Sequence, residues 1–198
     1  CELPVERPLL ASWEAKTNPA QVRLQAHLDE VAAWFADLSL PEEGLRLRYE
    51  IDVVDPARLS RHHDLDNYLY PIVAKLGWRR FTQVEGVKRV GGGSLLRVSS
   101  ELGSEEHATI RSWVEIPRGI GERDFKAYVQ ASLSGEEVLP EGPVEVGCHY
   151  RTGPNRNWAF YWKPTLDAMG PVLGTASPRP FHPDDDRITS LRFTREVD

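Results

Sequence analysis

Two aspartates two positions apart stand in the tetrapeptide Asp64-Leu65-Asp66-Asn67, and their types and spacing suit the binding of a divalent cation. Carboxylate oxygens are the ligands that Mg²⁺ prefers, and it needs only a few of them because it keeps several waters. The tetrapeptide also stands where a helix is predicted to begin. Asp and Asn are favoured there as caps that stabilise the positive helix end. On these four residues alone, a site and a simple helix cap both remain open.

Further candidates lie in the second half of the chain. Lys163 and Asp167 are one helical turn apart, and Asp184-Asp185-Asp186 follows a proline-containing loop. The structural alternative for the acidic triplet is a turn that faces water. Close carboxylates repel one another and raise at least one pKa when no metal is bound, and a lysine offers a compact charge to a phosphate. Such a set suits phosphodiester hydrolysis, in which Mg²⁺ or Mn²⁺ activates water and neutralises phosphoryl charge.

Hydrophobic periodicity predicts the elements that must position these residues. Asn18-Pro19 is a helix start, and apolar residues then recur at helical spacing: Leu24, Leu28, Val31, Phe35 and Leu38. Alternation predicts strands from Leu45 to Val53 and from Val144 to Tyr150. The run Gly91-Gly92-Gly93 predicts a hairpin between strands 84–90 and 94–99, and a further strand is expected from Thr109 to Ile116.

These elements occur twice in the same order. Residues 68–77 align with 161–170 through a shared Tyr, Pro and closing Gly, Leu40-Pro41-Glu42 aligns with Leu139-Pro140-Glu141, and residues 83–88 align with 187–192. A second helix is predicted through Phe125, Tyr128, Val129 and Leu133. The sequence therefore predicts an α+β chain of two helix-strand-helix-strand halves, 1–104 and 105–198, that form a pseudo-two-fold dimer.

The net charge of −6 is uneven. Residues 1–100 carry 13 Lys and Arg against 14 Asp and Glu, and residues 101–198 carry 11 against 16. A nucleic-acid binder usually has a basic excess, which this chain lacks. Local basic residues are nevertheless expected around the Asp64 motif: Arg58, Arg61, His62, His63, Arg79, Arg80, Lys88 and Arg89. Solvated loop and strand faces are their ordinary explanation.

Composition also bears on the compartment. No apolar run is long enough for a membrane span, no signal peptide is recognisable, and the two cysteines, Cys1 and Cys148, imply no disulfide framework. We therefore expect a cytoplasmic protein without a membrane partner. A first residue Cys1 is also how a processed lipoprotein begins, although loss of an initiator Met or a trimmed start is the interpretation that we favour.

The order of elements and motifs resembles the RusA-type Holliday junction endonucleases. Asp64, Asp66 and Asn67 fit that family's Asp-x-Asp-Asn motif, whereas its helix lysine falls on Tyr70 and its Asp-Asp pair on Arg80 and Phe81. In the second half Lys163 fits the helix lysine, Asp184-Asp185 fits the Asp-Asp pair and Asp167 fits a common acidic position. There Asn157, Ala159 and Phe160 stand in the Asp-x-Asp-Asn places. Each half resembles a degenerate copy, and the two sets are complementary.

This resemblance implies a divalent-metal-dependent endonuclease that acts on branched or structured DNA, or a non-catalytic relative that binds it. Asp64, Asp66 and Asp185 would hold Mg²⁺ or Mn²⁺, Lys163 would neutralise phosphate charge, and Asn67 would orient the first carboxylates. Asp167, Asp184 and Asp186 would support them, and Arg58, Arg61, His63, Arg79, Arg80 and Lys88 would contact DNA. His62, His63 and His182 are weaker metal-ligand candidates. A small protein-interaction module unrelated to nucleic acid remains the alternative.

Overall fold

The computed structural model describes residues 1–6, 9, 17–53, 55–56, 59, 64–100, 112–117 and 119–198. The strands are β1 (Glu2–Val5), β2 (Leu45–Asp52), β3 (Phe81–Arg89), β4 (Ser94–Ser99), β5 (Val144–Thr152) and β6 (Ile188–Val197). The α-helices are α1 (Pro19–Ala36), α2 (Leu65–Leu76), α3 (Glu122–Leu133), α4 (Trp162–Asp167) and α5 (Gly170–Leu173). Short 3₁₀ turns are η2 (Trp78–Arg80), η3 (Trp158–Tyr161) and η4 (Asp185–Arg187).

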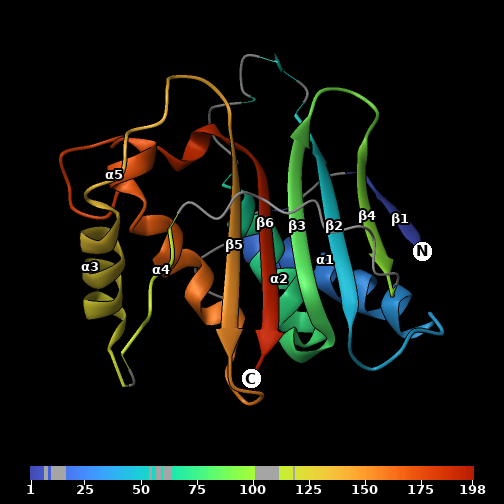
Figure 1. Ribbon diagram of the computed structural model, residues 1–198. Helices are drawn as coiled ribbons and strands as arrows, with labels where there is room; N and C mark the ends of the chain where they lie inside the picture. The colour runs from blue at the N-terminus through green and yellow to red at the C-terminus, as the bar shows by residue number, and fades with distance from the viewer. Residues whose placement is uncertain are drawn as a thin grey trace.

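The six strands of the described residues form one mixed sheet in the order β1-β4-β2-β3-β6-β5. Both strands beside Gly91-Gly92-Gly93 form, but the predicted hairpin is wrong, because β2 lies between β3 and β4 and pairs with each of them. β2 is parallel to β3 and β5 is parallel to β6, whereas β3 and β6 are antiparallel in the middle of the sheet. α1 and α2 lie behind the sheet in Figure 1, and α3 lies beyond the β5 edge. The chain is therefore an α+β protein, and β2 and β3 end at the same upper end where β5 and β6 begin (Figure 1).

α1 begins where the sequence predicts. The side chain of Asn18 accepts a hydrogen bond from the Ala20 N–H at 2.8 Å, and Pro19 takes the first helical position, where its missing N–H is not needed. Its buried residues are Leu24, Leu28, Val31 and Phe35. The predicted helical face is confirmed from Leu24 to Phe35 and packs against the sheet and α2, whereas Leu38 lies beyond the end of α1 and is partly buried.

α2 lies directly on β3. Alternate residues of β2 point to the core and are almost fully buried: Leu45, Leu47, Tyr49 and Ile51. On β3 the corresponding position is Gly86, where a Cβ would meet Leu69 at 3.1 Å and Leu65 at 3.3 Å. The absence of a side chain at Gly86 lets the first turn of α2 approach the strand closely.

Two predictions in the second half are wrong. Residues 112–117 form no strand, and the remainder of the predicted strand, Thr109 to Arg111, lies outside the described residues. The second-half helix predicted by alignment with 68–77 is not continuous, because it is divided into η3, α4 and α5. Pro164 is not the cause, because the aligned Pro71 lies inside the continuous helix α2. Pro171 lacks the N–H that would bond to Asp167 in a continuous helix, and Gly174 after α5 has a φ of 80°, so the segment is divided.

One hydrophobic core spans residues of both predicted halves. Trp158 and Trp162 are completely buried in it, and the Trp162 ring stacks on Phe193 of β6 at 4.3 Å between centroids. A smaller cluster joins α3 to α4 through Phe125, Val129, Leu133 and Ala168. Among the helices of the described residues, none is long and apolar enough to cross a membrane.

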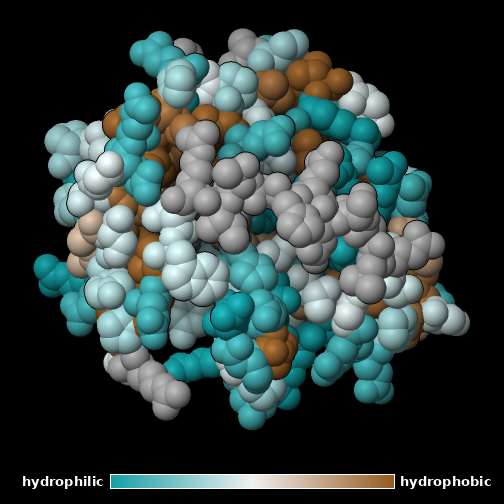
Figure 2. Space-filling model, viewed as in Figure 1, coloured by the Kyte–Doolittle hydropathy of each residue, from teal (hydrophilic) through white to brown (hydrophobic). Residues whose placement is uncertain are grey.

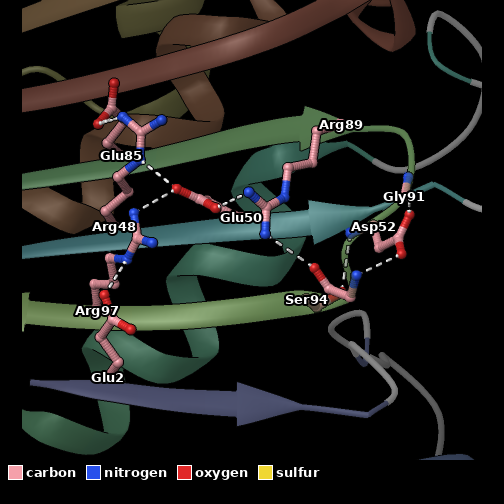
Figure 3. A network of polar contacts seen from close by, with 10 residues as sticks. Glu2, Arg48, Glu50, Asp52, Glu85, Arg89, Gly91, Ser94 and Arg97 are labelled. Atoms are coloured by element: carbon pink, nitrogen blue, oxygen red, sulfur yellow. Dashed lines mark hydrogen bonds and ion pairs between the residues drawn. The ribbon is translucent and has the colours of Figure 1, made fainter.

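The sheet face turned toward the viewer in Figure 1 carries charged side chains. Figure 2 shows hydrophilic residues over much of this side of the molecule, with separate apolar patches. Arg48 donates to the buried carboxylates of Glu50 at 3.1 Å and Glu85 at 2.6 Å, and Arg97 donates to Glu50 at 2.9 Å (Figure 3). Arg192 of β6 donates to Glu85 at 3.2 Å. Because these buried charges are paired, the network ties β4, β2, β3 and β6 together.

Candidate functional site

Acidic side chains from distant segments converge on the ammonium group of Lys163. Its Nζ atom lies 3.1 Å from Asp167, 3.7 Å from Asp185 and 3.9 Å from Asp66. Asp66 belongs to the first predicted half, and the other three residues belong to the second. The structure therefore brings together the complementary residues of the two halves in one cluster.

Three elements hold this cluster. Asp64 is the N-cap residue of α2 and Asp66 lies in its first turn, while Lys163 and Asp167 are one turn apart on α4 and Asp185 begins η4. Asn67 Nδ2 donates to Asp64 Oδ2 at 3.1 Å, which is the contact that an orienting role requires. A cleft of about 230 Å³ opens beside the cluster, lined by Asp64, Lys163, Asp167, Ala176, Ser177, His182, Pro183, Asp185 and Asp186.

Asp66 is the most buried acid of the cluster. Only 3% of its surface is exposed, and its Oδ1 atom has no hydrogen-bond partner. Burial, together with the neighbouring carboxylate of Asp64, raises the pKa of Asp66 to about 6, against the opposing charge of Lys163. A buried carboxylate with one unpartnered oxygen is a group for which a bound cation would remove a substantial desolvation penalty.

The other two predicted ligands have the same electrostatic character. Burial and the nearby Asp64 raise the pKa of Asp185 to about 7, although Lys163 opposes the change. Burial also raises the pKa of Asp64, with a further contribution from Asp186. For Lys163, burial disfavours the charge, but Asp66, Asp167 and Asp185 outweigh it and raise the pKa of its ammonium group. One lysine thus leaves the carboxylates incompletely neutralised.

Lys88 differs from its prediction as a surface contact to DNA. The residue is only 4% exposed, and its Nζ donates to the main-chain oxygen of Asp186 at 2.7 Å. Burial lowers the pKa of Lys88, although Asp186, Asp64 and Asp185 all oppose the change. The reason is strand alternation. Val84, Gly86 and Lys88 share the inward face of β3, so the Lys88 side chain reaches η4 through the interior of the protein.

Of the three aspartates predicted to support the metal ligands, two lie at the cluster or its cleft and the third does not line the cleft. Asp167 binds both Lys163 and Lys126, the latter at 2.8 Å, and Asp186 lines the cleft. Asp184 is not among the cleft residues, and its main-chain N–H donates to the Gly174 oxygen at 3.0 Å. Asp184 therefore holds the loop before η4.

The predicted basic surround of the Asp64 motif is wrong for Arg79 and Arg80. They lie in η2, beyond the opposite end of α2, and twelve helical residues separate the two ends by roughly 18 Å. Arg79 donates to Asn155 at 3.1 Å and stacks over Trp78, and Arg80 stacks over Phe35. Arg58, Arg61, His62 and His63 lie outside the described residues.

The donor set suits Mg²⁺ or Mn²⁺ because it consists of carboxylate oxygens, and the unpartnered oxygen of Asp66 supports that fit. In the part of the chain that the structure describes, no three His, Cys, Asp or Glu side chains are arranged as a ready metal site. Lys163 lies between the acids, so a cation there would have to displace its ammonium group.

Sequence reasoning missed Lys126 and gave Lys88 a different role. Lys126 of α3 joins the site through Asp167, and nothing in the local sequence links residues 126 and 167. The buried position of Lys88 could have been predicted, since a lysine two positions after Gly86 lies on the inward face of the strand and needs a buried partner.

Comparisons of the chain with protein-family models, with curated proteins and with solved structures found no match.

Proposed function

We propose that the chain is a fused pair of RusA-like units. The two parallel pairs, β2 with β3 and β5 with β6, support this proposal. A helical segment connects the two strands of each pair, α2 in the first and α4 with α5 in the second, and the pairs meet antiparallel at β3 and β6. Each parallel pair also has a register shift after its first residue, between Leu45 and Arg46 and between Val144 and Glu145. A repeated irregularity is a feature that duplication would transmit. Both halves come from one chain, so we expect a monomer in solution.

We infer that the Lys163 cluster acts on phosphodiesters of branched or structured DNA. The observation that carries this inference is the approach of Lys163 Nζ to within 4 Å of Asp66, Asp167 and Asp185. Neither half has the complete set of acids and lysine in its own sequence. Their convergence beside a cleft gives one composite site, and one site should nick a single strand.

Asp64, Asp66 and Asp185 would hold Mg²⁺ or Mn²⁺, which when bound supplies an activated water and neutralises phosphoryl charge. Lys163, released from its pairing with the acids, would present its charge to a phosphate oxygen. Asn67 keeps the Asp64 carboxylate in place through its 3.1 Å hydrogen bond. The Lys88 ammonium group restrains the η4 backbone from the buried side at Asp186.

A second candidate is a relative that binds branched DNA without cleaving it. The pairing of Lys163 with three carboxylates favours this possibility, since a lysine can replace a cation as the compensating charge. The buried Oδ1 atom of Asp66 favours the catalytic candidate instead, because it has no hydrogen-bond partner and could accept a cation as its ligand.

Cleavage of a four-way junction and of a flap, with Mg²⁺ or Mn²⁺ present, tests the proposal. Asp66→Asn should reduce cleavage by roughly a hundredfold or more, the scale expected when a group that stabilises transition-state charge is lost. The matched control is Asp37→Asn, at the exposed end of α1 away from the cleft.

Equal cleavage by Asp66→Asn and the parent would overturn the site assignment. Junction binding that weakens steeply with salt, with no cleavage under either metal, would select the non-catalytic relative. Absence of binding at every salt concentration would leave the protein-interaction module.

A further inference from the structure

A second pocket, of about 220 Å³, opens between α3 and the η3–α4 segment. Its aromatic residues are Phe125, Phe160 and Tyr161, and its polar residues include Glu122, Arg156 and Asn157. Ligand pockets usually combine an apolar or aromatic wall with a few polar groups that fix orientation. This pocket has that composition, and its volume is suited to one ring system rather than to a larger ligand.

The pocket and the Lys163 cleft share a wall. Tyr161 and Pro164 face the pocket, whereas Lys163 and Asp167 on the same short segment face the cleft. Lys126 joins the two sides, because its Nζ lies 2.8 Å from Asp167 and 3.1 Å from Glu122. Ion pairs therefore run without interruption from the buried Asp66, through Lys163 and Asp167 at the cleft and Lys126, to Glu122 at the pocket.

The aromatic residues of the pocket differ in exposure. Phe125 is buried, and its ring centroid lies 5.3 Å from that of Tyr161. The Phe160 ring is nearly perpendicular to Tyr161, with centroids 5.7 Å apart, and 51% of Phe160 is exposed. A large apolar ring left half in water beside a pocket is a surface that a planar ligand would cover.

The polar groups suit the edge of a nucleobase and its phosphate. Asn157 Oδ1 accepts from the Ala159 N–H at 3.2 Å, and its amide N–H₂ group remains as a donor. Glu122 provides carboxylate oxygens that can accept from exocyclic amines, and Arg156 provides a guanidinium group that can bind phosphate. Amide, carboxylate and guanidinium groups beside an aromatic ring are the means by which unstacked bases are recognised.

We propose that this pocket receives one unpaired nucleobase of the strand whose phosphate lies at Lys163. The substrate would then be single-stranded or would carry an extrahelical nucleotide at the site of action. This inference rests on the proposed function for the identity of the strand at Lys163.

The test uses the full chain, a chelator in place of metal, and a single-stranded oligonucleotide whose adenines are replaced by 2-aminopurine. Stacking in the pocket should quench 2-aminopurine fluorescence when the parent protein binds. Phe160→Ala should abolish that quenching and weaken binding by roughly 5- to 150-fold, the range that corresponds to one base stacked on an aromatic side chain. Tyr128→Ala is the matched control, because Tyr128 is an exposed aromatic of α3 that does not line the pocket.

Equal quenching and affinity for Phe160→Ala and the parent would overturn the inference, and so would equal affinity for an oligonucleotide with abasic sites. Cleavage with Mg²⁺ is measured separately on the same proteins. Cleavage that depends on Asp66, without quenching that depends on Phe160, would reject the pocket and leave the proposed function standing. Quenching that depends on Phe160, in a protein that cleaves nothing, would support the pocket and count against hydrolysis.

Discussion

Two of the carboxyl groups beside Lys163, those of Asp66 and Asp185, reduce folding stability at neutral pH. Asp66 and Asp185 have pKa values of about 6 and about 7, both above the ordinary value for Asp. Between about pH 4 and pH 7 the folded chain therefore binds more protons at these groups than the unfolded chain does. The sign follows directly: their contribution to stability is greatest at low pH and is lost as pH rises through this window.

Asp185→Asn should consequently be more stable than the parent at pH 8 and similar to it at pH 4.5. The expected difference at pH 8 is on the order of 1–3 kcal/mol, because Asn keeps the shape of the side chain and removes the buried charge. Urea denaturation at the two pH values measures it. If the proposed cation binds, Mg²⁺ at pH 8 should stabilise the parent more than the variant. A variant that is less stable than the parent at pH 8 would contradict this account of the cluster.

Lys88 provides a second prediction at this scale. Lys88→Met keeps most of the aliphatic stem but removes the positive charge facing Asp64 and Asp185, so the pKa values of both carboxyl groups should rise. If cleavage requires the ionised acids, the midpoint of its pH profile should move upward by about one unit. Lys75→Met, at the far end of α2, is the control. Reduced stability with an unchanged midpoint would show that Lys88 is only structural.

At the scale of elements, the packing of α2 against β3 determines where Asp64 and Asp66 lie. Gly86 lies beneath Leu65 and Leu69, which are buried in the first two turns of the helix. Leu65 stands between the two aspartates in the sequence. Any displacement of α2 from the strand therefore moves both acids relative to Lys163 on α4.

Gly86→Ala should accordingly impair stability and the site together. The added Cβ would lie 3.1 Å from Leu69 Cδ1 and 3.3 Å from Leu65 Cδ2, so both side chains would have to shift, and both are buried in the core. Overpacking of this kind typically costs about 1–3 kcal/mol. Chemical denaturation measures the loss of stability. If the proposed cleavage occurs, its rate in the folded variant measures the displacement of the acids. A variant with unchanged stability and activity would mean that α2 is not held in place by this contact.

Local signals were sufficient for most elements and insufficient for others. The Asn18-Pro19 start and the apolar spacing behind it predicted α1, and alternation predicted β2 and β5. The second-half helix was predicted by alignment, but its additional proline at position 171 broke the correspondence. A strand was also expected from Thr109 to Ile116, yet a strand forms only where a neighbour supplies hydrogen bonds, and residues 112–117 have no strand partner among the described residues.

At the scale of the whole molecule, the two predicted halves share one sheet and one core. β3 and β6 pair in the middle of the sheet, and Trp158 of η3 donates to the Trp78 oxygen across the halves at 3.0 Å. If the halves were separated, β3 and β6 would each become an unpaired edge. We therefore expect the chain to unfold as one cooperative unit.

Leu69→Ala tests that expectation. Leu69 is fully buried, so the substitution should cost about 2–5 kcal/mol through lost burial and the cavity left behind. The whole chain should still melt in a single transition at a lower temperature, with equal calorimetric and van't Hoff enthalpies. Two separated transitions, with only one displaced by the substitution, would show that the halves fold independently.

The sequence by itself determined the residue types of the candidate site and most of the elements that carry them, because helix starts and strand alternation depend on near neighbours along the chain. Only the tertiary structure decided that Asp66 and Asp185 meet at Lys163. It also decided that the buried Lys88 contacts the main chain of η4, and that Arg79 and Arg80 lie at the other end of α2. The physical reason is that these relations depend on which strands pair and on which side of the sheet a helix packs. Those choices are made by burial of the common core, to which residues from both ends of the chain contribute.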